Sequence, residues 1–152
     1  MKLISMGLLA GVLVAAAGAL VARRRYVVVT VEGTSMAPTL RDGDRVLVRR
    51  RRVDQVSRGD VVVLEPPSDP ARVFVPETDG TRWNIKRAVA LPGDPVPPDV
   101  DGPAAGAVAR VPAGALVVYG DNPHSVDSRQ RGFFPADRLL GVALRRLGGS
   151  AL

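Results

Sequence analysis

The sequence predicts a mostly β domain, folded as a partly open barrel and joined to one N-terminal transmembrane helix. Val-rich runs bounded by Gly, Pro and Asp recur along residues 26–147 without a convincing helical period, which is typical of short strands. An uncharged apolar run, residues 3–22, precedes them. We therefore expect a membrane anchor at residues 1–25, a single domain at 26–147 and a short tail at 148–152.

The uncharged run is long enough to cross a membrane. It lies between Lys2 and three consecutive arginines at residues 23–25. Twenty residues at the helical rise cover about 30 Å, the hydrocarbon thickness of a bilayer. A cleaved signal peptide is the alternative, with the small residues 17–19 as its cleavage site. The length of the run and the abrupt arginine stop favour a retained, single-pass anchor.

The predicted strands are short apolar segments that end at turn residues. We expect them at residues 26–32, 45–48, 60–64, 73–75, 83–90, 115–119 and 140–144. The Pro-rich segments 66–70 and 95–114 are predicted to be loops.

The composition restricts the chemistry available to the chain. Its 152 residues include no Cys and a single His. The lack of Cys excludes a disulfide framework and thiolate metal sites, and one His leaves little material for a zinc site or a Ser-His-Asp triad. We expect neither a cofactor nor a metal ion.

The charge of the chain is strongly positive. The formal net charge is +6, and residues 49–52 are four consecutive arginines. Such a run can bind nucleic acid or anionic lipid. Only 4% of the residues are aromatic, which leaves few rings on which bases could stack. We predict no nucleic-acid partner and a solvated arginine face against lipid headgroups, reinforced by residues 23–25.

Lysine is scarce in this chain. Nineteen of the twenty-one basic residues are arginine, and Lys86 is the only lysine after Lys2. A desolvated ammonium group can lose its proton near neutral pH, whereas a guanidinium group cannot. Lys86 is therefore a candidate general base. The scarcity of lysine by itself is explained better if Lys86 lies at a solvated strand edge. A catalytic role for Lys86 therefore needs a second catalytic residue to support it.

Ser35 supplies that second residue. It follows the first predicted strand closely, between Gly33 and a Met-x-Pro turn. A strand can hold a serine rigidly at its end, and a neighbouring glycine lets another backbone approach, as attack on a peptide carbonyl requires. A third polar segment, residues 120–132, follows the predicted strand at 115–119.

Four motifs, in their order along the chain, resemble those of type I signal peptidases, which are membrane-bound serine proteases with a Ser/Lys dyad. Any one of them would mean little, but four in order argue against chance. The resemblance covers most of residues 1–145. The motifs are Ser35-Met36-Ala37-Pro38-Thr39 with Gly43-Asp44, Arg58-Gly59-Asp60-Val61-Val62, Lys86-Arg87 with Leu91-Pro92-Gly93-Asp94, and Gly120-Asp121-Asn122 with Ser125-Val126-Asp127-Ser128-Arg129.

The chain resembles the compact members of that family. Only residues 95–115 separate the third motif from the fourth, where many members carry a large inserted β-domain. Compact members include mitochondrial inner-membrane peptidases and small bacterial maturation proteases. Within the fourth motif only Pro123 and His124 separate Asn122 from Ser125, about one residue fewer than in better-known members.

The resemblance implies a role for each matching residue. Ser35 is the expected nucleophile and Lys86 the general base that takes its proton. Ser125 is expected to orient Lys86 through a hydrogen bond. Apolar neighbours such as Met36 would lower the pKa of Lys86 by desolvation.

The remaining motif residues are expected to support the site. The resemblance implies a structural ion pair between Asp127 and Arg129, with Ser128 in a similar supporting role. Gly33 stands where some members contribute a hydroxyl to the oxyanion hole. The expected donors are therefore the Ser35 backbone N–H and a second backbone group or water.

The implied activity is cleavage of signal or leader peptides from translocated precursors after small residues, by a domain on the extracytoplasmic side of the cell membrane. The positive-inside rule points the other way, because the arginines at 23–25 outnumber the charges before the apolar run. We expect the extracytoplasmic orientation, since translocated substrates emerge on that side.

Two other interpretations stay open. A self-cleaving repressor-type protein shares the Ser/Lys chemistry, but it would need an N-terminal DNA-binding helical domain where this chain has its uncharged run. A catalytically inactive, basic, membrane-anchored β-module would carry the motifs as relics. His124 lies beside the fourth motif in a Pro-containing turn, where exposure is the expected state.

Overall fold

The computed structural model describes residues 15–16, 18–20, 23–65, 83–101, 106, 108–149 and 152. Its strands are β1 (Tyr26–Thr30), β2 (Arg45–Arg50), β3 (Val61–Leu64), β4 (Asn84–Ala90), β5 (Ala115–Tyr119), β6 (Phe134–Pro135) and β7 (Leu139–Arg146). Three short helical segments lie between them: η1 (Val53–Gln55), α2 (Ser128–Arg131) and η2 (Ala136–Arg138).

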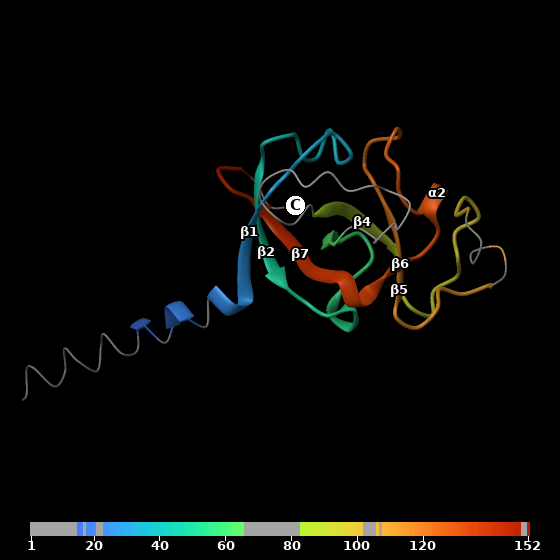
Figure 1. Cartoon of the computed structure of the whole chain (residues 1–152), viewed down its shortest axis with the longest axis horizontal. Helices are drawn as coiled ribbons and strands as arrows, with labels where there is room; N and C mark the ends of the chain where they lie inside the picture. The colour runs from blue at the N-terminus through green and yellow to red at the C-terminus, as the bar shows by residue number, and fades with distance from the viewer. Residues whose placement is uncertain are drawn as a thin grey trace, which may run out of the picture.

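The strands form a single sheet in the order β1-β2-β7-β3-β4-β5-β6 (Figure 1). Each pair of neighbours is antiparallel. The prediction of a mostly β fold is thus confirmed. Strands β1 and β6 lie at the two edges, so the sheet that the described residues build is not closed.

The predicted transmembrane helix, residues 3–22, lies largely outside the described residues. Among the residues that are described, no helix is both long and apolar enough to cross a bilayer. Figure 1 shows the chain leading away from the sheet at the start of β1. The anchor at residues 1–25 stays a prediction.

Most of the predicted strands occur close to their expected positions. The strand expected at 73–75 lies outside the described residues. Strand β6 was not predicted, because its two residues carry no pattern of their own and pair with Ala115 and Leu116 of β5. The predicted loop at 95–114 has an isolated bridge between Pro95 and Arg110.

Strand β3 lies at the centre of the core. It pairs with β7 on one side and β4 on the other, and all four of its residues are buried. Val61 and Val63 pack into one hydrophobic cluster, whereas Val62 and Leu64 pack into a second. Successive side chains point to opposite faces of a strand, so a continuous apolar run fits a strand that is covered on both faces.

Candidate active site

Lys86 lies in the interior of the sheet. It belongs to β4, where its Cα pairs with that of Val62 in the buried strand β3. Its side chain is only 4% exposed, so the interpretation of Lys86 as a solvated edge residue is wrong. The Lys86 Nζ donates a hydrogen bond of 2.7 Å to the Ser125 hydroxyl. Burial thus comes together with a polar partner, as a buried amine requires.

The environment of Lys86 favours its neutral form. Loss of hydration on burial is the main effect that lowers the pKa of Lys86 below the ordinary 10.5. The negative charge of Asp127 opposes this shift, and the positive charges of Arg131 and Arg129 add to it. A lysine that sheds its proton more readily than usual is suited to general-base chemistry.

The Ser35 segment is fixed by the core and by one glycine. Met36 and Leu40 are 1% and 0% exposed and belong to the hydrophobic cluster that also holds β2. Gly33 adopts a φ of 81°, a conformation that a residue with a Cβ rarely adopts. Its N–H donates to the Asp42 carboxylate at 2.7 Å. Ser35 itself is half-buried, next to the fully buried Met36.

The segment 120–122 connects Ser35 to Ser125. The Asn122 N–H donates to the Ser35 carbonyl at 3.0 Å, and the Asn122 side-chain amide donates to the Thr34 carbonyl at 3.0 Å. A Cβ on Gly120 would overlap both the Ser125 hydroxyl and the Ser35 carbonyl oxygen. Both serines therefore lie directly against Gly120, and Lys86 binds one of them.

Arg87 and Asp121 hold the same segment from the other side. The Arg87 guanidinium forms two hydrogen bonds to the Asp121 carboxylate, of 2.8 and 2.6 Å. The Thr39 hydroxyl, which follows the Ser35 turn, donates to that carboxylate at 2.6 Å. Two-point contacts of this kind fix orientation as well as distance. The residue after Lys86 is thereby tied to the loop that contacts Ser35.

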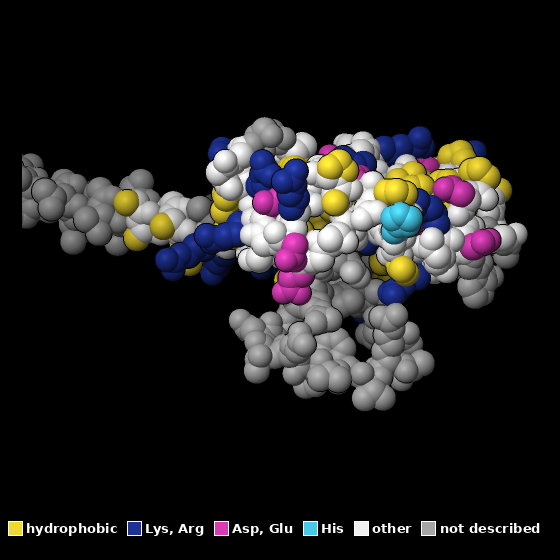
Figure 2. Space-filling model, turned by 90° about the horizontal axis from the view of Figure 1, so that it is seen from above, with side chains coloured by type: hydrophobic (Ala, Val, Ile, Leu, Met, Phe, Trp, Pro, Cys, Tyr) yellow, Lys and Arg dark blue, Asp and Glu magenta, His cyan; other side chains and the backbone are white. Residues whose placement is uncertain are grey.

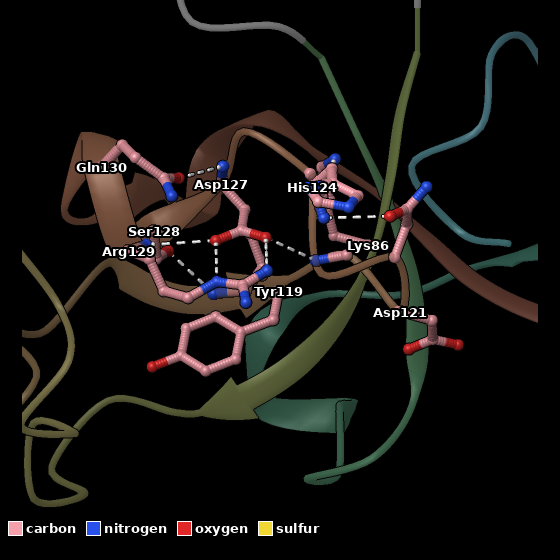
Figure 3. Close-up of polar contacts among 12 residues, drawn as sticks. Lys86, Tyr119, Asp121, His124, Asp127, Ser128, Arg129 and Gln130 are labelled. Carbon is pink, nitrogen blue, oxygen red and sulfur yellow. Dashed lines mark hydrogen bonds and ion pairs between the residues drawn. The ribbon is translucent and has the colours of Figure 1, made fainter.

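Asp127 is the buried centre of a second network (Figure 3). Its side chain is 0% exposed, accepts a hydrogen bond from the Gly120 N–H at 2.8 Å, and caps α2 by accepting from the Arg129 N–H. Arg129 also pairs with the carboxylate through two side-chain contacts, of 2.9 and 2.7 Å. Ser128 accepts a hydrogen bond from the Val118 N–H at 2.9 Å. Figure 3 shows the Asp127 carboxylate between Arg129 and Lys86.

Tyr119 and Asp99 extend this network away from Lys86. The Arg129 guanidinium lies 5.0 Å from the centre of the Tyr119 ring. The Tyr119 hydroxyl donates to the Asp99 carboxylate at 2.5 Å. Asp99 belongs to the segment between β4 and β5. Its hydrogen bond to Tyr119 therefore links that segment to the end of β5, just before the loop that carries Asp127.

The structure brings most of the sequence-predicted residues together. Lys86 contacts Ser125, Asp127 pairs with Arg129, and Ser128 is bonded to β5. The Ser35 main chain adjoins Gly120, although across the described residues the hydrogen bond of the Lys86 amine goes to Ser125 and not to the Ser35 hydroxyl.

His124 is exposed, as predicted for its turn (Figure 2). In the described parts of the chain, no three His, Cys, Asp or Glu side chains form a group that could hold a metal ion. Sequence reasoning gave no role to Gly120, Arg87, Asp121 and Asn122, although each lies inside a motif it had singled out.

Comparison with known proteins identifies relatives for nearly the whole chain. Residues 3–102 and 99–147 match the family described as signal peptidase, peptidase S26. A probable signal peptidase I-1 from Synechocystis is 33% identical over 150 residues, which cover 83% of this chain and 71% of that protein. The Arabidopsis mitochondrial ATP-independent inner membrane protease subunit 1a is 36% identical over 132 residues, covering 81% and 72%. The mouse mitochondrial inner membrane protease subunit 1 is 32% identical over 118 residues, covering 75% and 64%.

Proposed function

The chain belongs to the signal peptidase family, peptidase S26, and we propose that it is a membrane-bound serine endopeptidase in which Ser35 is the nucleophile and Lys86 the general base. Family membership implies the serine endopeptidase activity. One observation carries the assignment of the base: the amine of the buried Lys86 binds Ser125 beside the Ser35 main chain. The lowered pKa of Lys86 agrees with this role.

The proposed reaction proceeds through an acyl-enzyme. The Ser35 Oγ attacks the scissile carbonyl while neutral Lys86 accepts the hydroxyl proton on Nζ. The resulting ammonium group returns that proton to the leaving amine when the peptide C–N bond breaks. In the second half, Lys86 accepts a proton from water as the water oxygen attacks the ester carbonyl, and it gives that proton to the Ser35 Oγ when the bond between Oγ and the acyl carbon breaks. The mature protein leaves first and the signal or leader peptide second.

Ser125 is the proposed orienting group for the base. Its hydroxyl accepts the Lys86 hydrogen bond, which directs the Nζ lone pair once the amine is neutral. Asp127 opposes the effect of burial, because its charge raises the pKa of Lys86, whereas the charge of its ion-pair partner Arg129 lowers that pKa. Ser128, the first residue of α2, ties that helix to β5 by accepting a hydrogen bond from the Val118 N–H.

The oxyanion hole is proposed to use the Ser35 N–H. The Gly33 N–H is already committed to Asp42 at 2.7 Å, so Gly33 contributes room for the substrate instead of a donor. A second donor would come from another backbone group or from water.

The proposed substrates are precursors with signal or leader peptides that carry small side chains near the scissile bond. The proposed domain plan is a single-pass anchor at residues 1–25, a peptidase domain at 26–147 with an extracytoplasmic location, and a tail at 148–152. Membrane lipid is the second proposed partner. The relatives named as inner membrane proteases support a membrane location.

Mutation of the two catalytic residues tests the proposal. We expect Ser35→Ala and Lys86→Ala each to abolish cleavage of a precursor peptide by the detergent-solubilised full chain. Lys86→Arg should be as inactive as Lys86→Ala, because a guanidinium keeps its proton. The double variant should be little worse than either single one, since residues that act as a unit are not additive. Lys2→Ala is the matched control, because it removes the only other lysine.

The outcomes separate the proposal from its alternatives. Substantial activity in Lys86→Arg would refute the lysine base. A wild-type chain that cleaves no peptide from a panel with small, large and charged residues before the scissile bond would favour the inactive membrane-anchored module. Cleavage that ignores Leu or Phe at the positions one and three residues before the bond would refute the proposed specificity while leaving the dyad in place.

A further inference from the structure

Two sets of arginines in the described part of the chain differ in their ion pairs. One group is neutralised by carboxylates of the domain. The pairs are Arg58–Asp94 at 2.5 Å, Arg87–Asp121 at 2.6 Å, Arg129–Asp127 at 2.7 Å and Arg146–Asp44 at 3.4 Å. These pairs tie loops to strands and to one another, so their charges have a structural use.

The second group has no such compensation. Residues 23–25 and Arg50 are exposed and Arg51 is half-buried. Within the part of the chain that the structure describes, none of these five arginines forms an ion pair. Their neighbour Arg52 pairs with Asp54 at 3.3 Å, but both side chains are largely exposed, and such pairs contribute little.

The pairing of β1 with β2 brings the two arginine runs together. Tyr26, the first residue of β1, is the Cα partner of Arg49 near the end of β2. Residues 23–25 therefore enter the sheet at the same end at which residues 49–52 leave it. Figure 2 shows basic side chains gathered where the N-terminal segment joins the sheet. We call residues 23–25 and 49–52 the basic end.

Within the described residues, the positive charge of the basic end is largely uncompensated. Like charges held side by side repel one another, and the carboxylate that Asp54 contributes neutralises one of seven arginines. The uncharged run 3–22 comes immediately before it, which puts the basic end at the headgroup level if that run spans the bilayer. Tyr26, whose ring lies 6.0 Å from the Arg49 guanidinium, is the kind of residue that is enriched at this level.

We propose that the basic end docks the folded domain onto the anionic headgroups of the membrane that holds the chain. This inference rests on the proposed anchor at residues 1–25, and it does not depend on the catalytic roles of Ser35 and Lys86. Docking would fix the orientation of the domain. Strand β1 runs from the basic end toward the Ser35 segment, and its five residues cover about 15 Å, so docking would also set the height of the nucleophile above the membrane.

A fluorescence measurement on the full chain tests the docking. The chain contains no Cys, so Gln55→Cys gives a single labelling site on η1, next to the basic end. Arg41→Cys gives a control site in the connection between β1 and β2, beyond their other end. Both would carry Ser35→Ala, which removes cleavage from the measurement. The labelled chains are placed in nanodiscs of phosphatidylcholine alone or with phosphatidylglycerol, each containing a headgroup-attached quencher.

We expect phosphatidylglycerol to increase quenching of the label at position 55 and to leave the label at position 41 unchanged. Each arginine near an anionic surface contributes about a fivefold factor, so Arg50→Gln with Arg51→Gln should lower the ratio of docked to undocked domain roughly 25-fold. Arg45→Gln with Arg131→Gln removes the same charge from exposed positions elsewhere and should leave docking unchanged. High salt should weaken docking.

Three results would overturn the proposal. The first is equal quenching at position 55 in both lipid compositions. The second is an equal effect of the two double variants, which would mean that net charge matters and the basic end does not. The third is binding of a short oligonucleotide to the basic end in discs without phosphatidylglycerol, together with no response to the anionic lipid, which would identify nucleic acid as the partner.

Discussion

Gly120 offers the sharpest test of how the site is assembled. Its φ is not among the positive values that favour glycine, so the backbone there would accept an alanine. The surrounding atoms leave no room for its side chain. A Cβ at this position would lie 2.5 Å from the Ser35 carbonyl oxygen and would overlap the Ser125 hydroxyl. Glycine is therefore needed at position 120 because two parts of the active site approach its Cα.

The size of the effect follows from these contacts. An ordinary contact begins at 3.4 Å, so Gly120→Ala must push the Ser35 main chain or its own segment by about 1 Å. A misplacement of about 1 Å at a reacting group costs about 10²-fold in rate. Overpacking a well-packed site costs about 1–3 kcal/mol of stability. We expect Gly120→Ala to lower kcat/KM on a precursor peptide about 10²-fold and to lower Tm by several degrees.

Gly106→Ala is the matched control, because a Cβ at Gly106 meets nothing within 4 Å. It should leave both kcat/KM and Tm unchanged. If Gly120→Ala kept more than half of the wild-type kcat/KM, the close approach of Ser35 and Ser125 at this point would be refuted. A loss of activity at 10 °C and at 30 °C alike would separate displacement of the nucleophile from partial unfolding.

The remaining predictions concern Lys86 and His124. Lys86 and Lys2 are the only lysines, so NMR of the chain labelled with ¹³C-lysine should give two ε-carbon signals. The signal that Lys86→Met removes belongs to Lys86, and it should titrate with a pKa below the ordinary 10.5. A normal titration would contradict the buried base. The unfolded chain then binds the Lys86 proton more tightly than the folded chain does, so the free energy of unfolding should rise with pH between the folded pKa and 10.5. Denaturant unfolding of wild type and Lys86→Met, measured across this range, should show that the variant lacks this rise. Cleavage rates should rise with pH through the folded pKa of Lys86 and level off above it, and a rate that falls there with the fold intact would argue against a lysine base. His124→Ala should keep most of the activity, because His124 is exposed and its hydrogen bond to the Asn122 side chain comes from its backbone N–H. A loss as large as that of Lys86→Ala would give His124 a catalytic role.

Local patterns along the chain were sufficient to predict much of the fold. The apolar runs at 61–64 and 115–119 are bounded by turn residues. Each run is therefore recognisable as a strand from its own sequence, without knowledge of the strands with which it pairs. Strand β6 and helix α2 span two and four residues and have too little sequence to show a period. Phe134 pairs with Leu116 of β5, and a capping box at Asp127 begins α2, so tertiary pairing and local capping decide them.

The candidate site was also predicted in part from the sequence and decided in part by tertiary packing. The scarcity of lysine and the order of the motifs predicted Ser35 and Lys86 as candidates, because chemistry restricts which residue types can act as nucleophile and base. The family resemblance added Ser125. The contacts of these residues could not be predicted, because Lys86 reaches Ser125, and the Ser35 main chain reaches Gly120, only after distant segments of the chain have packed.

By itself, the sequence predicted a mostly β fold, carried the family motifs and singled out Lys86 as the candidate base. Only the tertiary structure decided that Lys86 is 4% exposed and that Gly120 is needed for space and not for its φ. It also decided that the arginines at 23–25 and 49–52 gather at one end of β1 and β2. Burial, close approach and the summation of charge depend on distances between residues far apart in the chain, and no local pattern encodes those distances.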